Sequence, residues 1–308
     1  MYIKEFLKRM TRKSNLPLLV YLIINVVFIT EMIYFTIGDY VPYWESLMIG
    51  LALYAISISV ALSPLGEWIL RLQTGCKEIT RVEYSEFIGP IFKEVYEKAK
   101  ALDSTIPDDV HLYMNADEDA NAFATGRKTI CITEGLMHKP ANQIKATLAH
   151  EFGHLAHKDT DLILFVSVGN LIVSALILVV RVIIFISYLF GAVVAAFFGG
   201  PQGAVGSIMN AVIHLMETLF ITGLMWVWTK LGVILVMKTS RENEYEADEF
   251  SYNLGYGNDL CALLEKIGDV HANGLFANLA SSHPDKNERI GRLQKLGATY
   301  RAERRLEV

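Results

Sequence analysis

Four long apolar runs restrict this chain more than any other feature of its sequence. They cover residues 16–37, 43–64, 162–198 and 208–237, and segments of ordinary charge density separate them. A helix of about 20 apolar residues is long enough to cross the hydrocarbon core of a bilayer. Because of these runs, hydrophobic residues reach 52% of the 308 residues, more than soluble domains usually have. The sequence therefore predicts a mainly α integral membrane protein with about four transmembrane helices.

The charge pattern indicates which side of the membrane the chain begins on. Five lysine and arginine residues lie within residues 4–13, directly before the first run, and Asp39 follows that run. Cytoplasmic segments of membrane proteins carry an excess of basic residues, so we expect a cytoplasmic N-terminus. The net charge of −5 provides no overall basic field, so nucleic acid is not an expected partner.

The runs divide the chain into four parts. Residues 1–66 are expected to form one pair of transmembrane helices, and residues 162–237 a second pair. Residues 67–161 and 238–308 have the composition of water-facing protein, and we expect them to build one α+β catalytic domain with a small sheet. The elements predicted in its first part are a helix at 86–102, strands at 110–113, 120–125 and 129–133, and a helix at 142–158.

A short segment with metal-ligand spacing lies on the last of these helices. Residues 150–154 read HEFGH, which fits the pattern HExxH. Residues four apart project from one face of a helix, so His150 and His154 can reach a single Zn²⁺. Glu151 can then act as general base on a zinc-activated water. The pattern predicts a zincin-like (gluzincin) centre with one Zn²⁺ per chain, although Co²⁺ or Mn²⁺ also suit such ligands.

A catalytic zinc needs a third protein ligand and an open fourth position. Glu244, directly after the last apolar run, is the preferred third ligand. Asp248 is one helical turn further on and can accept a hydrogen bond from a ligating histidine. Glu242 and Glu246 are rivals for the role of Glu244. His157 shares a helix face with the first histidine, but it lies too far along the helix axis to join the same tetrahedron easily.

The shared metal also restricts the topology. Its ligands can meet only if the stretch 162–237 crosses the membrane an even number of times. We resolve this stretch as two crossings joined by a Gly-rich turn at 199–206, the first long and tilted or extended beyond the bilayer, which leaves Arg181 near the outer interface or facing a protein cavity. Re-entrant or non-spanning runs are the alternative. With two earlier spans, the site is cytoplasmic. His214 and Glu217 suggest a second metal site or a proton path, but we favour hydrogen bonding within the helix bundle.

Several motifs resemble the HtpX family of membrane-bound zinc metallopeptidases, which are relatives of the CAAX prenyl proteases. They occur in the family's order along nearly the whole chain. The matching segments are residues 121–126 (NAFATG), HExxH at 150–154, Ser240-Arg241, ExxxD at 244–248, His283-Pro284 and Glu288-Arg289-Ile290. The resemblance implies that Glu244 is the third zinc ligand and Asp248 its second-shell partner.

The resemblance also implies roles outside the metal site. Asn121 and Ala122 would lie on an edge strand that pairs with an extended substrate, although a turn residue is the alternative for Asn121. His283 and Arg289 would stabilise the developing oxyanion or lock the site electrostatically. The alternatives for these two are a helix cap and a surface ion pair.

The activity that the resemblance implies is hydrolysis of peptide bonds in membrane or misfolded proteins. Such an enzyme serves membrane protein quality control and the stress response, and its partners are these substrates and the lipid bilayer. The expected location is the plasma (inner) membrane, with several spans and the catalytic domain facing the cytoplasm. The alternatives are a CAAX-type prenyl-protein protease and a non-enzymatic membrane scaffold that has kept the fold.

Overall fold

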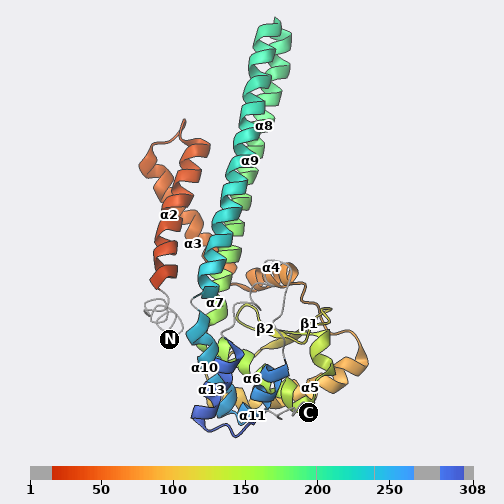
Figure 1. Cartoon of the computed structure of the whole chain (residues 1–308). Helices are drawn as coiled ribbons and strands as arrows, with labels where there is room; N and C mark the ends of the chain where they lie inside the picture. Colours follow the sequence, from red (N-terminus) through yellow and green to blue (C-terminus); the bar gives the residue numbers. More distant parts are fainter. Residues whose placement is uncertain (1–15, 199, 239, 267–284, 302–308) are drawn as a thin grey trace, which may run out of the picture. The chain divides into compact units, whose positions relative to one another are not determined.

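The computed structural model describes residues 16–198, 200–238, 240–266 and 285–301, and the chain forms two compact units (Figure 1). The helical unit comprises Leu16–Ala61 and Phe165–Ile234. The α+β unit comprises Leu62–Leu164 and the described residues from Leu235 onward.

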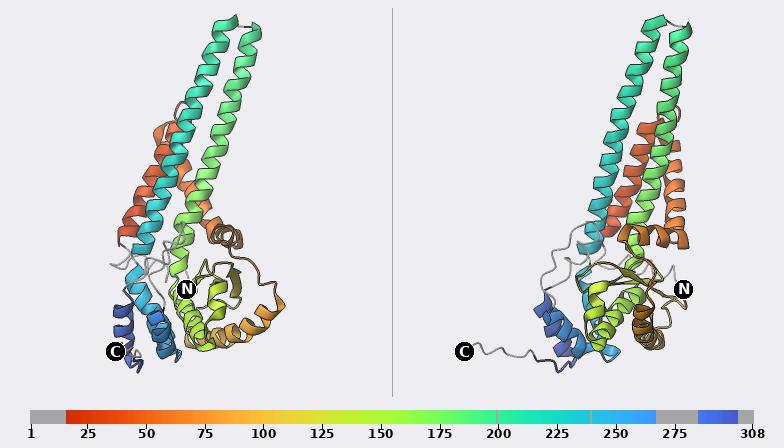
Figure 2. Two further views of the ribbon diagram at one scale, coloured as in Figure 1. Left: turned by 45° about the vertical axis from the view of Figure 1, so that its right-hand side comes forward. Right: turned by 90° about the vertical axis from the view of Figure 1, so that its right-hand side faces the viewer.

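Four long helices carry the apolar runs. They are α2 (Leu16–Ile37), α3 (Tyr43–Ala61), α8 (Gly169–Phe198) and α9 (Gly200–Lys238). All four are long and apolar enough to cross a membrane, and a helix satisfies its own backbone hydrogen bonds in lipid. The helices α8 and α9 run side by side as an antiparallel pair (Figures 1 and 2). The expectation of a mainly helical membrane protein with about four spans and a small sheet is confirmed.

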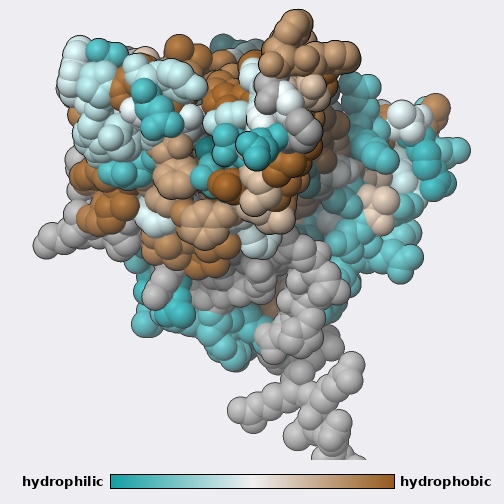
Figure 3. All heavy atoms as spheres, turned by 90° about the horizontal axis from the view of Figure 1, so that it is seen from above, coloured by the Kyte–Doolittle hydropathy of each residue, from teal (hydrophilic) through white to brown (hydrophobic). Residues whose placement is uncertain are grey.

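The surface of the helical unit is suited to lipid. Phe197 and Phe198 at the end of α8 are 80% and 89% exposed, and hydrophobic residues (brown) lie at the surface among hydrophilic ones (teal) in Figure 3. The turn expected at 199–206 is wrong beyond its first residues, because α9 begins at Gly200, whose φ is +70°. Glycines lower helix propensity in water, but in lipid the helix remains the way to satisfy the backbone.

A buried arginine lies between α8 and α9. The Nε atom of Arg181 donates to Oγ1 of Thr218 at 2.9 Å, and Nη2 donates to Oε2 of Glu217 at 2.9 Å. His214 contacts the same guanidinium, with 3.4 Å between Nδ1 and Nη2. Arg181 therefore faces protein, and His214 and Glu217 hydrogen-bond within the helix bundle.

The α+β unit is built around a three-stranded sheet and one buried helix. The strands are β1 (His111–Asn115), β2 (Ala122–Ala124) and β3 (Thr129–Thr133), in the order β1-β3-β2. β1 is parallel to β3, and β2 is antiparallel to it, so β2 lies at an edge. The central helix α6 (Ala141–His157) packs against α5 (Val82–Leu102), which begins four residues earlier than predicted. Ile144, Leu148 and Phe152 of α6 are fully buried.

The sequence analysis did not predict the bounds of the remaining helices. The described ones are α4 (Pro64–Thr74), α7 (Asp159–Ile163), α10 (Ser240–Asn253), α11 (Gly257–Lys266) and α13 (Lys286–Leu296), with a π-helical segment at Leu164–Val168. The helix α10 packs along α6. This contact joins the two parts of the chain that the apolar helices separate in sequence.

Candidate metal centre

The contact between α6 and α10 depends on Gly153, inside the HEFGH segment. A Cβ atom at this position would lie 2.8 Å from Cα of Ala247 on α10, closer than real Cβ atoms approach. Only glycine therefore permits this helix spacing. The close approach brings Glu244, three residues before Ala247, against His150, one turn before Gly153, and His154, directly after it.

Three potential ligand atoms converge at this contact. Nε2 of His150 lies 3.2 Å from Nε2 of His154. Oε2 of Glu244 lies 3.5 Å from the first of these atoms, and Oε1 of Glu244 lies 3.3 Å from the second. Zinc bonds of about 2.0–2.1 Å in a tetrahedron place neighbouring ligand atoms about 3.3–3.4 Å apart. The donor set and its spacing therefore fit a tetrahedral zinc ion with one position open.

Glu151 lies beside these ligands and is also buried. Its Oε2 atom accepts a hydrogen bond of 2.7 Å from the backbone N–H of Ala124 in β2. On the other edge of β2, the backbones of Asn121 and Thr125 bond to β3. Alternation along the strand therefore directs the backbone groups of Ala122 and Ala124 toward the open edge. The edge strand and the glutamate thus face the same space.

Asp248 and Arg289 support the first histidine. Nδ1–H of His150 donates to Oδ1 of Asp248 at 2.9 Å. The guanidinium of Arg289, from α13, donates to both Asp248 oxygens at 2.9 and 2.7 Å. One Nη atom also lies 3.5 Å from the Glu244 carboxylate. Burial alone would raise the pKa of Asp248, but Arg289 lowers it overall. The arginine thus places one positive charge beside the two buried carboxylates that α10 contributes to the site, Glu244 and Asp248.

The sequence analysis missed the partner of the second histidine. Nδ1–H of His154 donates to Oδ2 of Asp159 at 3.0 Å. Asp159 is the first residue of α7, and Lys158 before it has φ +60°, a left-handed conformation that is uncommon for a non-glycine residue. This turn ends α6 and directs the chain back toward the site. A carboxylate five residues after the second histidine was the available signal.

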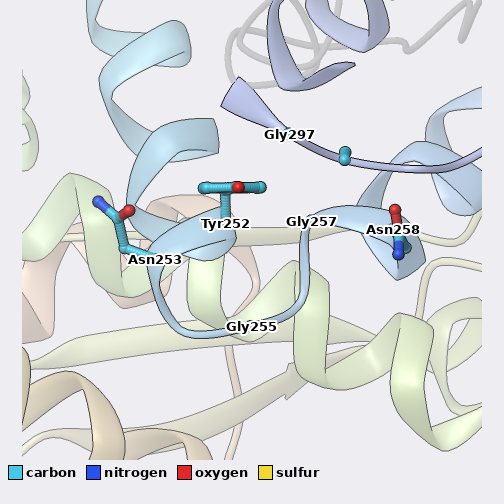
Figure 4. A pocket seen from close by; sticks show the side chains of 7 residues that line it. Tyr252, Asn253, Gly255, Gly257, Asn258 and Gly297 are labelled. Atoms are coloured by element: carbon cyan, nitrogen blue, oxygen red, sulfur yellow. The ribbon is translucent and has the colours of Figure 1, made fainter. Parts of the chain in front are cut away.

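The other predicted positions lie as follows. Glu242 is exposed, and His157 lies 3.9 Å from the Glu246 carboxylate, so the structure groups only Glu244 with the two histidines. His283 lies outside the described residues. The shallow pocket of about 320 Å³ between α10, α11 and Gly297 (Figure 4) is lined by no imidazole, carboxylate or thiol and is not this site.

Zinc binding should strengthen as the pH rises. Burial lowers the pKa values of His150 and His154, but their acidic partners raise both above the ordinary 6.5. Protons compete with the metal for the imidazoles, and raised pKa values extend this competition to higher pH. We expect zinc affinity, measured by chelator competition, to keep rising above pH 6.5. An affinity already constant at pH 6.5 would contradict the assigned ligands.

Substituting Gly153 should open the metal centre. We expect Gly153→Ala to force α6 and α10 apart, to destabilise the fold by about 1–3 kcal/mol, and to weaken zinc binding. Gly291→Ala is the matched control, because an added Cβ there meets nothing within 4 Å. The measurement is zinc content after dialysis together with the unfolding temperature. Unchanged zinc retention in Gly153→Ala would show that the helix spacing is not critical.

Comparison with known proteins identifies the family. The model of peptidase family M48 matches residues 91–297, which include HExxH, the edge strand, Glu244 and Arg289. The chain belongs to peptidase family M48. Given its four apolar helices, it is a membrane peptidase of that family, with proteins as substrates.

Individual relatives agree with this assignment. Protease HtpX of Ectopseudomonas mendocina is 25% identical over 281 residues, which cover 82% of this chain and 88% of the relative. A Protease HtpX homolog of Nitrosomonas eutropha is 28% identical over 261 residues, covering 77% and 80%. The crystal structure of S. mikatae Ste24p has a TM-score of 0.40 and 17% identity, and covers 94% of this chain and 66% of its own. The two Protease HtpX relatives confirm the resemblance to the HtpX family.

Proposed function

We propose that this chain is a zinc-dependent endopeptidase that cleaves membrane or misfolded proteins. The observation that carries the proposal is the convergence of ligand atoms from His150, His154 and Glu244. The two Nε2 atoms lie 3.2 Å apart, and each lies within 3.5 Å of one oxygen of the Glu244 carboxylate. Glu151 beside them is a buried carboxylate that is placed to exchange a proton with substrate. The names of the relatives support protease activity. The proposed substrate class, membrane or misfolded proteins, rests on the likeness of this chain to those relatives.

Each residue then has a defined task. A bound Zn²⁺ supplies Lewis acidity, which lowers the pKa of water and polarises a peptide carbonyl. Glu151 accepts the proton of the attacking water and returns it to the leaving amine nitrogen. The N–H of Ala124 holds one oxygen of Glu151, which fixes the orientation of the other. Ala122 and Asn121 belong to the edge segment beside which an extended substrate can add as a strand.

The site faces the cytoplasm in this proposal. Glu244 and the two histidines meet in one unit, so α8 and α9 between them make two crossings. The basic residues within 4–13 favour a cytoplasmic N-terminus, and two further spans return the chain to that side.

Metal removal tests the proposal directly. The full chain is purified in detergent, stripped with a chelator, and assayed for casein cleavage before and after zinc is restored. We expect cleavage only with zinc. A metal-independent activity would overturn the proposal. Cleavage of a farnesylated CAAX peptide but not of casein would instead favour a prenyl-protein protease, and the absence of bound zinc would favour a scaffold.

A further inference from the structure

The short helix α4 begins immediately after a candidate membrane span. The span α3 ends at Ala61, and α4 begins at Pro64. Three residue steps of extended chain cover at most about 10 Å, so the start of α4 lies near the end of that span whatever the placement of the two units. Ser63 caps the helix by accepting from the Leu65 N–H at 3.3 Å, and Gly75 ends it with φ +71°. The helix is therefore well delimited at both ends.

One face of α4 is apolar and exposed. Leu65, Trp68 and Leu72 are 52%, 51% and 62% exposed, and their spacing places them on one side of the helix at about 100° per residue. Ile69, which is partly exposed, extends the same face. Four neighbouring apolar side chains on an 11-residue helix form a surface that a water-facing helix does not need.

The opposite face of α4 holds the turn that follows the edge strand. The buried carboxylate of Glu67 accepts from the backbone N–H of Arg127 at 2.9 Å and from Oγ1 of Thr129 at 3.3 Å. Gly126 in this turn has φ +74°, and a Cβ there would lie 2.9 Å from the Glu67 side chain. The polar face of α4 is thus fitted to the turn between β2 and β3.

We propose that α4 lies in the membrane–water interface and docks the β2–β3 turn there. Leu65, Trp68 and Leu72 enter the boundary between headgroups and acyl chains, where tryptophan is favoured. The exposed Lys77 and Arg81 shortly after the helix suit anionic headgroups. The partner is the lipid surface itself, because the helix starts within about 10 Å of a span. The edge strand is thereby held close to the bilayer, where a substrate segment leaves the membrane.

Spin labels can locate this face without any assay of activity. Labels are attached to Leu65→Cys and Leu72→Cys in the full chain, whose native cysteines are all buried. The chain is reconstituted in vesicles of phosphatidylcholine with phosphatidylglycerol. The control is Leu102→Cys, at a site that is 49% exposed at the end of α5. We expect positions 65 and 72 to collide with oxygen in preference to a water-soluble nickel chelate, at a depth of about 5–10 Å, and position 102 to show the reverse.

Two outcomes would overturn the proposal. Nickel collisions at 65 and 72 equal to those at 102 would place α4 in water. Protection from both reagents, together with dipolar coupling between labels, would show that a second copy of the chain covers the face.

A second arm rests on the proposed function. Leu65→Gln with Leu72→Gln should lower cleavage of a membrane-anchored substrate roughly tenfold or more, while casein cleavage stays unchanged. Leu102→Gln should alter neither. Loss of both activities would mean misfolding, and the label data would then decide the position of α4.

Discussion

Glu151→Gln is expected to abolish proteolysis while leaving zinc and fold in place. The amide has nearly the shape of the carboxylate, and its oxygen can still accept the 2.7 Å hydrogen bond from the Ala124 N–H. It cannot take a proton from water, and general-base catalysis typically contributes about 10²–10⁴-fold. Casein cleavage on a gel, with wild type and variant loaded with equal zinc, measures the loss.

The zinc content of the same samples makes this test specific. The variant should bind zinc as the wild type does, because Glu151 is not among the three proposed ligands. If wild type and variant both cleave, either a contaminating protease is present or another group is the base. If the variant loses zinc as well, Glu151 supports the metal, and its role in proton transfer is not established by the result.

Removing the buried arginine is expected to cause the largest loss of stability. In Arg289→Met, the buried carboxylate of Asp248 loses both charged hydrogen bonds. An uncompensated buried charge costs about 3–5 kcal/mol. Since about 1.4 kcal/mol corresponds to a factor of ten, amide exchange in α10 and α13 should accelerate by roughly 100-fold or more in detergent micelles.

A second substitution separates lost charge from lost packing. Asp248→Asn keeps an oxygen for the Nδ1–H of His150 but needs no cation. The double variant with Arg289→Met should therefore exchange more slowly than Arg289→Met alone. Amide exchange in Arg289→Lys should be faster than in the wild type and slower than in Arg289→Met. The ammonium keeps the positive charge, but it cannot match the geometry with which the guanidinium bonds both oxygens of Asp248. Equal exchange in the single and double variants would show that the arginine stabilises through its packing and not through its charge.

The membrane-spanning helices were predictable because length and apolarity alone specify them. The run beginning at Leu16 coincides with α2, and the C-terminal end of α3 was predicted only three residues too late. The helix α4 escaped prediction because its two faces serve different partners, so its composition matches neither a span nor a simple surface helix. The glycines after Gly200 were misread as a turn, because turn chemistry in water was applied to a segment for which lipid favours a helix.

The residues of the site also divide into those that the sequence pattern predicts and those that depend on the tertiary structure. The i, i+4 spacing of His150 and His154 needed no tertiary information. Glu244 lies 90 residues beyond His154, so it was only the preferred candidate among rivals until the likeness to a family supported it. Asp159 was missed, and its place in the sequence was only a weak signal, because its approach depends on a left-handed Lys158, a conformation that sequence patterns favour at glycine or asparagine. The guanidinium of Arg289 contacts Asp248 and Glu244 of α10. These contacts favour a role in holding the site together by charge over a role in stabilising the oxyanion of the reaction.

The order in which the site's parts are synthesised has a consequence for the enzyme's own biogenesis. Glu151 emerges first, then the helices α8 and α9, then Glu244 and Asp248, and only afterwards the α13 helix with Arg289. Until that helix docks, two buried carboxylates repel each other beside the metal position. The newly made protease therefore completes insertion before its site is neutralised and rigid.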